Sequence, residues 1–260
     1  MTKYPICDAL MEDAAIHCAA LVITENVITG GTGAPSFAQP SDKLRSGTIT
    51  FVEYNDKVYG ITCWHVIDIY RRYLTESGNQ FSHSLQTMVN GFYAVLDRFI
   101  KPSPDFGMPE IDIAIREINP KHVQAIGKIP YNIDGNPNTP AHIRHGYAVG
   151  FPESLKKKVN ADPFGYQVSM PQVEILAEIT KMPEGRFSLN SELPEKPKYD
   201  DYSGMSGGPI FWSTENDYGI FGIIYEGGVG SELADGKSVH IYGEKADKKE
   251  IIRWISQINA

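Results

Sequence analysis

Short apolar runs, separated by turn-forming residues, recur along most of this 260-residue chain. Residues 48–54 and 57–62 are rich in β-branched and aromatic side chains, and the Asn55-Asp56 pair between them predicts a β-hairpin. Further runs of this kind cover residues 91–96, 111–115, 145–149, 166–171, 173–180, 209–212, 218–225 and 238–242. Many short strands with turns between them favour a sandwich or a barrel over a parallel α/β sheet. The sequence therefore predicts an all-β chain.

Helical periodicity is confined to a few segments. Residues 246–258 carry an apolar stripe at helical spacing, which predicts a C-terminal α-helix. A second helix is predicted at residues 66–75. Residues 8–28 form an amphipathic segment, interpreted as a helix that runs into a strand, and the glycine-rich residues 30–33 end it.

Charge and cysteine content exclude several classes of function. The net charge of −8 argues against a nucleic-acid partner, because a phosphate-binding surface needs clustered Lys and Arg. The single basic run, at residues 156–158, is interpreted as a solvated loop. Three cysteines, Cys7, Cys18 and Cys63, have neither the number nor the spacing of a disulfide framework or a zinc site. No metal and no cofactor are expected.

The start of the chain does not read as a targeting segment. Acidic residues precede the short apolar run 14–23, which makes a poor signal peptide and is too short to span a bilayer. We therefore expect a cytoplasmic protein with no membrane partner.

The strongest chemical motif is the Gly-Met-Ser-Gly-Gly-Pro sequence at residues 204–209. A serine hydroxyl is a poor nucleophile by itself, so an acyl-transfer enzyme must supply a base and hydrogen-bond donors for the oxyanion. Flanking glycines let the backbone expose the Ser206 hydroxyl and let the amides of Gly204 and Ser206 converge on one oxygen. The alternative interpretation is a glycine-rich turn with an incidental serine.

Two further residues have the chemistry that a nucleophilic serine needs. His65 follows the predicted strand 57–62, and a histidine that titrates near neutrality can take the serine proton and return it to the leaving group. Asp112 lies in the apolar run 111–115, where a carboxylate is costly to bury unless it is paired. Each residue also has a simpler interpretation, as a structural histidine and as an aspartate that faces water.

Together, in the order His, Asp, Ser, these motifs resemble the trypsin/chymotrypsin-like serine peptidase family, in its intracellular, disulfide-free, bacterial-type form. The matching residues are 62–66, 112–114, 204–209 and 218–227, and the resemblance covers residues 44–260. It implies two antiparallel six-stranded β-barrels of the chymotrypsin-like fold with a C-terminal α-helix. The implied domains are an N-terminal extension (1–40), a first barrel (41–125), a second barrel (126–245) and the helix (246–260).

The resemblance also implies roles for individual residues. Ser206 would be the nucleophile of a serine endopeptidase, His65 its general base and acid, and Asp112 the carboxylate that fixes the imidazole tautomer. The amides of Gly204 and Ser206 would form the oxyanion hole. Backbone at Tyr225, Glu226 and Gly227 would bind an extended substrate as an added strand.

Asp200 lies six residues before Ser206, at the position that forms the base of the primary specificity pocket in trypsin-like relatives. A carboxylate there would favour Lys or Arg before the scissile bond. The alternative is a polar loop residue.

Two departures from the family pattern stand out. Met205 occupies the position where zymogen-activated relatives carry an aspartate that pairs with a freed N-terminus. We therefore expect no proteolytic activation switch, and control by residues 1–40, a regulatory partner or substrate-induced ordering. The paired cysteines of secreted relatives are also missing, and Cys63 is expected to pack as a small hydrophobe.

Two other functions compete with the peptidase. The spacing Gly204-x-Ser206-x-Gly208 also fits the nucleophile elbow of an α/β-hydrolase, but that fold needs a helix after the serine and the order Ser, Asp, His. The second alternative is a catalytically lapsed peptide-binding scaffold on the same fold. A protein or peptide is the expected partner in both the peptidase and the scaffold, and the oligomeric state stays open.

Overall fold

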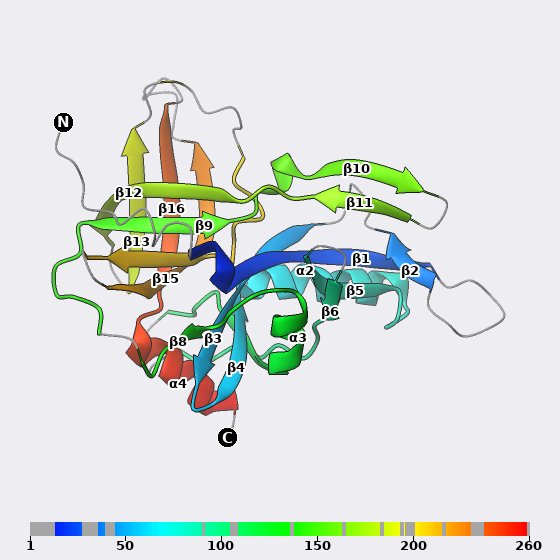
Figure 1. The fold of residues 1–260 in the computed structure, drawn as a ribbon, viewed down its shortest axis with the longest axis horizontal. Helices are drawn as coiled ribbons and strands as arrows, with labels where there is room; N and C mark the ends of the chain where they lie inside the picture. The colour runs from blue at the N-terminus through cyan, green and yellow to red at the C-terminus, as the bar shows by residue number, and fades with distance from the viewer. Residues whose placement is uncertain are drawn as a thin grey trace.

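The computed structural model describes residues 14–27, 36–39, 45–89, 92–104, 109–135, 138–162, 165–182, 185–192, 195, 201–214, 217–229 and 237–258. Strands make up most of it, in two units (Figure 1). The first unit is an eight-stranded sheet whose main path runs β6-β5-β1-β3-β4-β7. Its strands are β1 (Cys18–Val27), β2 (Ser36–Gln39), β3 (Ser46–Tyr54), β4 (Lys57–Thr62), β5 (His83–Val89), β6 (Phe92–Val95), β7 (Ala114–Ile118) and β8 (Tyr131–Asn132).

Two additional pairings extend this sheet. Strand β2 pairs with β1, and β8 pairs with β3 in the one parallel contact among the described strands. The chain after β6 returns beside β7, where Ile100 and Ile115 exchange two backbone hydrogen bonds of 2.9 Å. The sheet is thereby curled toward a barrel.

The second unit is a closed six-stranded barrel in the order β12-β13-β16-β15-β14-β9. Its strands are β9 (His145–Gly150), β12 (Val173–Lys181), β13 (Arg186–Glu192), β14 (Pro209–Ser213), β15 (Tyr218–Val229) and β16 (Ser238–Lys245). A separate hairpin of β10 (Lys157–Asp162) and β11 (Gly165–Ser169) reaches from this barrel toward β2 (Figure 1).

Helices are few and short. They are α2 (Trp64–Ser77), α3 (Pro120–Ala125), α4 (Lys248–Ile258) and the 3-10 turns η1 (Ala15–His17) and η2 (Glu153–Leu155). Helix α4 is amphipathic and buries Ile251, Trp254 and Ile255, as its apolar stripe predicts, and it packs near β7. No described helix has the length and apolar character needed to cross a bilayer.

The predicted hairpin at residues 48–62 is confirmed, and its two-residue turn explains how β3 and β4 are aligned. Strands β3 and β4 pair from Thr50–Ile61 to Tyr54–Lys57. Asn55 and Asp56 have φ angles of 50° and 59°, so both central residues adopt the left-handed conformation that a two-residue hairpin turn requires. This hairpin carries Thr48 at one end and leads directly into α2 at the other.

Apolar packing joins the two units. Side chains of the second barrel, including Val149 and Phe211, lie in the same buried cluster as the interior of the first sheet. At this boundary the imidazole of His17 lies 2.9 Å from the hydroxyl of Tyr218. The interior of the second barrel forms its own cluster. A cleft between the units is therefore bounded by elements that are fixed relative to one another.

The predicted all-β fold class is confirmed, but some boundaries differ from those predicted. Strand β1 falls in the range assigned to an N-terminal extension, yet it lies between β5 and β3 with Leu21 and Ile23 fully buried. The first sheet also extends to Asn132, beyond residue 125, because β8 pairs with β3. Two residues of the basic run 156–158, which was interpreted as a solvated loop, belong to strand β10 (Lys157–Asp162).

Candidate active site

His65 and Asp112 form a hydrogen-bonded pair at the start of helix α2. The Nδ1 atom of His65 lies 2.5 Å from Oδ2 of Asp112, and the backbone amide of His65 donates to Oδ1 at 2.9 Å. A neutral imidazole that gives its Nδ1 proton to the carboxylate keeps a lone pair on Nε2. The pair therefore presents a base on the side of the ring away from Asp112.

Asp112 lies just before strand β7, which begins at Ala114, whereas the sequence places it within a strand. The reason is that its carboxylate and its backbone carbonyl accept hydrogen bonds from the first amides of α2. Besides the contact with His65, the Asp112 carbonyl accepts a hydrogen bond of 3.3 Å from the amide of Trp64. Free amides at a helix N-terminus favour negative charge, so the helix stabilises the Asp112 carboxylate.

Ser206 lies in the loop before β14, and strand β3 of the first unit holds this loop from the opposite side. The amide of Thr48 donates to the Ser206 carbonyl at 2.8 Å, and the Thr48 hydroxyl donates to the Gly204 carbonyl at 2.8 Å. The hydroxyl of Thr50 donates to the Gly207 carbonyl, also at 2.8 Å. Three hydrogen bonds thus cross between the units at the serine, and no sequence pattern signals the two threonines.

Two glycines of the loop are required by its shape. Gly204 and Gly207 have φ angles of 95° and 94°, which side chains rarely adopt. A Cβ atom on Gly207 would lie 2.0 Å from the Thr48 carbonyl oxygen, and one on Gly204 would lie 2.7 Å from the amide nitrogen of Glu153. The loop can therefore approach the first unit this closely only with glycine at these positions.

The amides of Gly204 and Ser206 are available as donors. Within the described part of the chain, neither amide donates to a protein acceptor. The preceding carbonyl, of Ser203, accepts a hydrogen bond of 2.6 Å from the Glu153 amide. Because the C=O and N–H of a trans peptide point in opposite directions, this bond turns the Gly204 N–H away from Glu153.

Met205 fills the interior of the second barrel. Its side chain is fully buried in the same cluster as Tyr202 and Ile224, and it packs against Gly150. A methionine fills an irregular gap readily, and its burial fixes the loop without any charge. At the position where zymogen-activated peptidases carry an aspartate, this chain therefore has a buried apolar side chain that anchors the loop.

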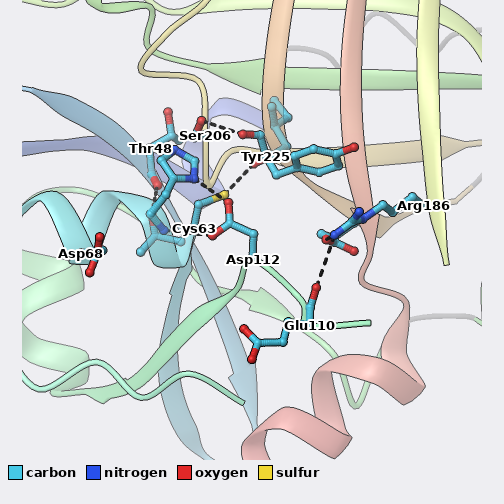
Figure 2. Close-up of polar contacts among 12 residues, drawn as sticks. Thr48, Cys63, Asp68, Glu110, Asp112, Arg186, Ser206 and Tyr225 are labelled. Carbon is cyan, nitrogen blue, oxygen red and sulfur yellow. Dashed lines mark hydrogen bonds and ion pairs between the residues drawn. The ribbon is translucent and has the colours of Figure 1, made fainter. Parts of the chain in front are cut away.

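Ser206 and His65 line one cleft with a cavity volume of about 190 Å³, together with Val66, Ile69 and Gly204. The Ser206 hydroxyl donates to the Tyr225 carbonyl at 3.1 Å, as Figure 2 shows. Arg45 and Glu153, also in the lining, approach to 3.8 Å. The structure therefore brings together the imidazole, the carboxylate and the serine that the sequence singles out.

Cys63 lies next to Asp112 and close to His65; Cys63 and Asp112 are labelled in Figure 2. The cysteine was expected to pack as a small hydrophobe, and it is fully buried, where its thiol also donates to the Ile224 carbonyl at 3.0 Å. The side-chain donor atoms of Cys63, His65 and Asp112 lie within 4.8 Å of one another. Burial raises the pKa of the Cys63 thiol well above its ordinary value, so the thiolate that a metal needs is disfavoured.

The remaining candidate residues lie along strand β15. Tyr225, Glu226 and Gly227 follow the point where β14 stops pairing, at Ile223, while β16 covers the other edge. Beyond Ile223, Ile224 exchanges backbone hydrogen bonds with Gly207 and Gly208, and Gly228 forms a bridge with Asp201, while no described backbone group pairs with residues 225–227 on this edge. Asp200 lies outside the described residues.

Of the comparisons with known proteins, the one with solved structures supports this fold. No protein-family model matches the chain, and no curated protein matches it significantly. A solved structure that matches is that of AL20, a thermostable serine protease from an extremophilic microorganism. It is 13% identical, the match covers 94% of this chain and 96% of that chain, and the TM-score is 0.50. The chain thus has a chymotrypsin-like fold, with one closed barrel, one partly closed sheet and a C-terminal helix.

Proposed function

We propose that this protein is a serine endopeptidase in which Ser206 is the nucleophile. The observation that carries the proposal is the shared cleft, in which a serine from one unit meets a histidine held by an aspartate from the other. Bonded to Asp112 through Nδ1, the imidazole is set to accept the Ser206 proton at Nε2 as the hydroxyl leaves the Tyr225 carbonyl.

Attack on the scissile carbonyl places a negative charge on its oxygen. The amides of Gly204 and Ser206, which have no protein acceptor among the described residues, are the donors for this charge. The protonated imidazole then gives its proton to the leaving amine, and a water molecule, activated by the same histidine, hydrolyses the acyl-enzyme on Ser206.

The open edge of β15 is proposed to bind the substrate as an additional strand. Backbone of Tyr225 and Gly227 would pair with residues before the scissile bond, because β14 stops short of this part of the strand. Free thiols at the buried Cys18 and Cys63 fit a reducing compartment such as the cytoplasm, and we include that location in the proposal.

Asp200→Asn tests the proposed specificity for basic residues. If Asp200 is the base of the primary pocket, the substitution removes a carboxylate that pairs with Lys or Arg. We expect kcat/KM for substrates with a basic residue before the scissile bond to fall at least tenfold relative to apolar ones, measured with a peptide library. Wild-type cleavage without a basic preference would eliminate this role.

A fluorophosphonate probe tests the nucleophile directly, because it reacts with an activated serine. We expect wild-type protein and the Ser203→Ala variant to be labelled, and Ser206→Ala to remain unlabelled. Ser203 is the matched control, since it lines the same cleft three residues earlier. Mass spectrometry of the modified peptide identifies the residue.

The same experiment separates the peptidase from the lapsed scaffold. A folded wild-type protein that binds extended peptides but is neither labelled nor able to cleave them would support the scaffold. Labelling that persists in Ser206→Ala would assign the nucleophile to another residue.

A further inference from the structure

An ion pair in the second barrel, between a buried Glu244 and a partly exposed Arg186, reaches across to the segment that carries Asp112. Glu244 on β16 is 3% exposed and lies opposite Arg186 on β13 in the strand register. The Nε and Nη2 atoms of Arg186 both lie 3.1 Å from Oε1 of Glu244. A buried carboxylate is costly unless paired, so each residue depends on the other.

Both members of the pair also contact the backbone around Asp112. The Nη2 group of Arg186 donates to the Glu110 carbonyl at 3.3 Å, a contact drawn in Figure 2. The backbone amide of Asp112 also lowers the pKa of the Glu244 carboxylate, which places the two groups near one another. Arg186 therefore holds residue 110, and the pair lies beside residue 112, in a segment that belongs to no strand or helix.

Opposing effects act on the Glu244 carboxylate, and its pKa is raised overall. Burial raises the pKa of Glu244, and the nearby Asp112 carboxylate raises it further, whereas Arg186 lowers it. The Arg186 guanidinium also lies over the Tyr225 ring, 5.3 Å from its centroid. Arg186 thus compensates the Glu244 carboxylate, and its place is fixed by β15 as well as by β16.

We propose that Arg186 and Glu244 are positioning residues that fix the Asp112 carboxylate against His65. This inference rests on the proposed function. The Asp112 carboxylate accepts hydrogen bonds from Nδ1 and from the backbone amide of His65, so a shift of the 110–112 segment misplaces the base relative to Ser206. Misplacement of about 1 Å in a catalytic group can cost about a hundredfold in rate.

The test is the double variant Arg186→Met/Glu244→Met in the full chain. Apolar side chains of similar size often replace a buried ion pair without loss of stability, so the variant separates positioning from folding. The matched control is Arg144→Met/Glu178→Met, an exposed Arg–Glu pair with an Nε–Oε1 distance of 3.2 Å that joins β12 to the residue before β9.

We expect the Arg186/Glu244 double variant to lose kcat by about tenfold to a hundredfold with KM changed less than twofold. The control pair should retain wild-type kcat. Should the double variant unfold, Arg186→Lys serves instead, because lysine keeps the charge but lacks the fork that contacts Glu244 and Glu110 together. The expected loss is then severalfold.

A spectroscopic readout makes the test independent of turnover. The Nδ1 proton of His65 is expected as a low-field proton resonance in Ser206→Ala protein. This resonance should weaken or move upfield in the Arg186/Glu244 variant and persist in the control. An unchanged resonance together with unchanged kcat would overturn the inference. An inactive wild type that shows the resonance would refute the proposed function alone, and the resonance in the variants would still decide the inference.

Discussion

Ser206→Ala and His65→Ala are each expected to lower kcat by about a million-fold, and the double variant is expected to lose little more. The two residues act in one proton transfer, so removal of either leaves the other without a role. Purified variants assayed against a peptide substrate provide the measurement, with Ser203→Ala as a control that lines the same cleft.

The activity that remains in the single and double variants tests this prediction most directly. Without the nucleophile and base, the oxyanion donors and substrate binding still supply about a thousandfold to ten-thousandfold over water. If the effects of the single variants instead multiplied in the double variant, Ser206 and His65 would not function as one unit. The proposed mechanism would then be wrong.

Gly207→Ala is expected to reduce the free energy of unfolding by about 3 to 5 kcal/mol. The side chain forces a φ of 94° on alanine and places Cβ 2.0 Å from the Thr48 carbonyl, so the loop must move. Movement breaks the hydrogen bonds that Thr48 and Thr50 make to the loop. Guanidinium denaturation followed by tryptophan fluorescence measures the loss.

Two other glycines provide graded controls. Gly228→Ala meets no atom within 4 Å and needs no positive φ, so its effect should be within about 0.5 kcal/mol. Gly78→Ala, at the end of α2, also meets no atom but has a φ of 63°, and should cost about 1 to 2 kcal/mol. Equal stability of the Gly207 and Gly228 variants would contradict the close contact between loop and strand.

The sequence predicts the residues whose chemistry is scarce. A serine in a glycine-rich segment, a histidine after a strand and an aspartate in an apolar run can be selected because few other residue types perform these steps. The hairpin of β3 and β4 is predictable for a similar reason, since Asn55 and Asp56 suit a left-handed turn.

Other features depend on contacts that no local pattern contains. The run at residues 18–23 is apolar throughout, so its periodicity does not separate a buried strand from a helix, and β1 was assigned to an extension. Arg186 and Glu244 are ordinary strand residues in sequence, 58 positions apart. Only the closed barrel brings them together and turns them toward Asp112.

The hydroxyl groups of Thr48 and Thr50 on β3 hold the Ser206 loop of the second barrel. Neither unit therefore forms a complete active site by itself. A graft of the second barrel onto a different partner would carry Ser206 but leave the carbonyls of Gly204 and Gly207 without Thr48 and Thr50. A substitution at Thr48 or Thr50 is therefore expected to occur together with a compensating substitution in residues 204–207. The sequences of the two units are in this way linked to each other.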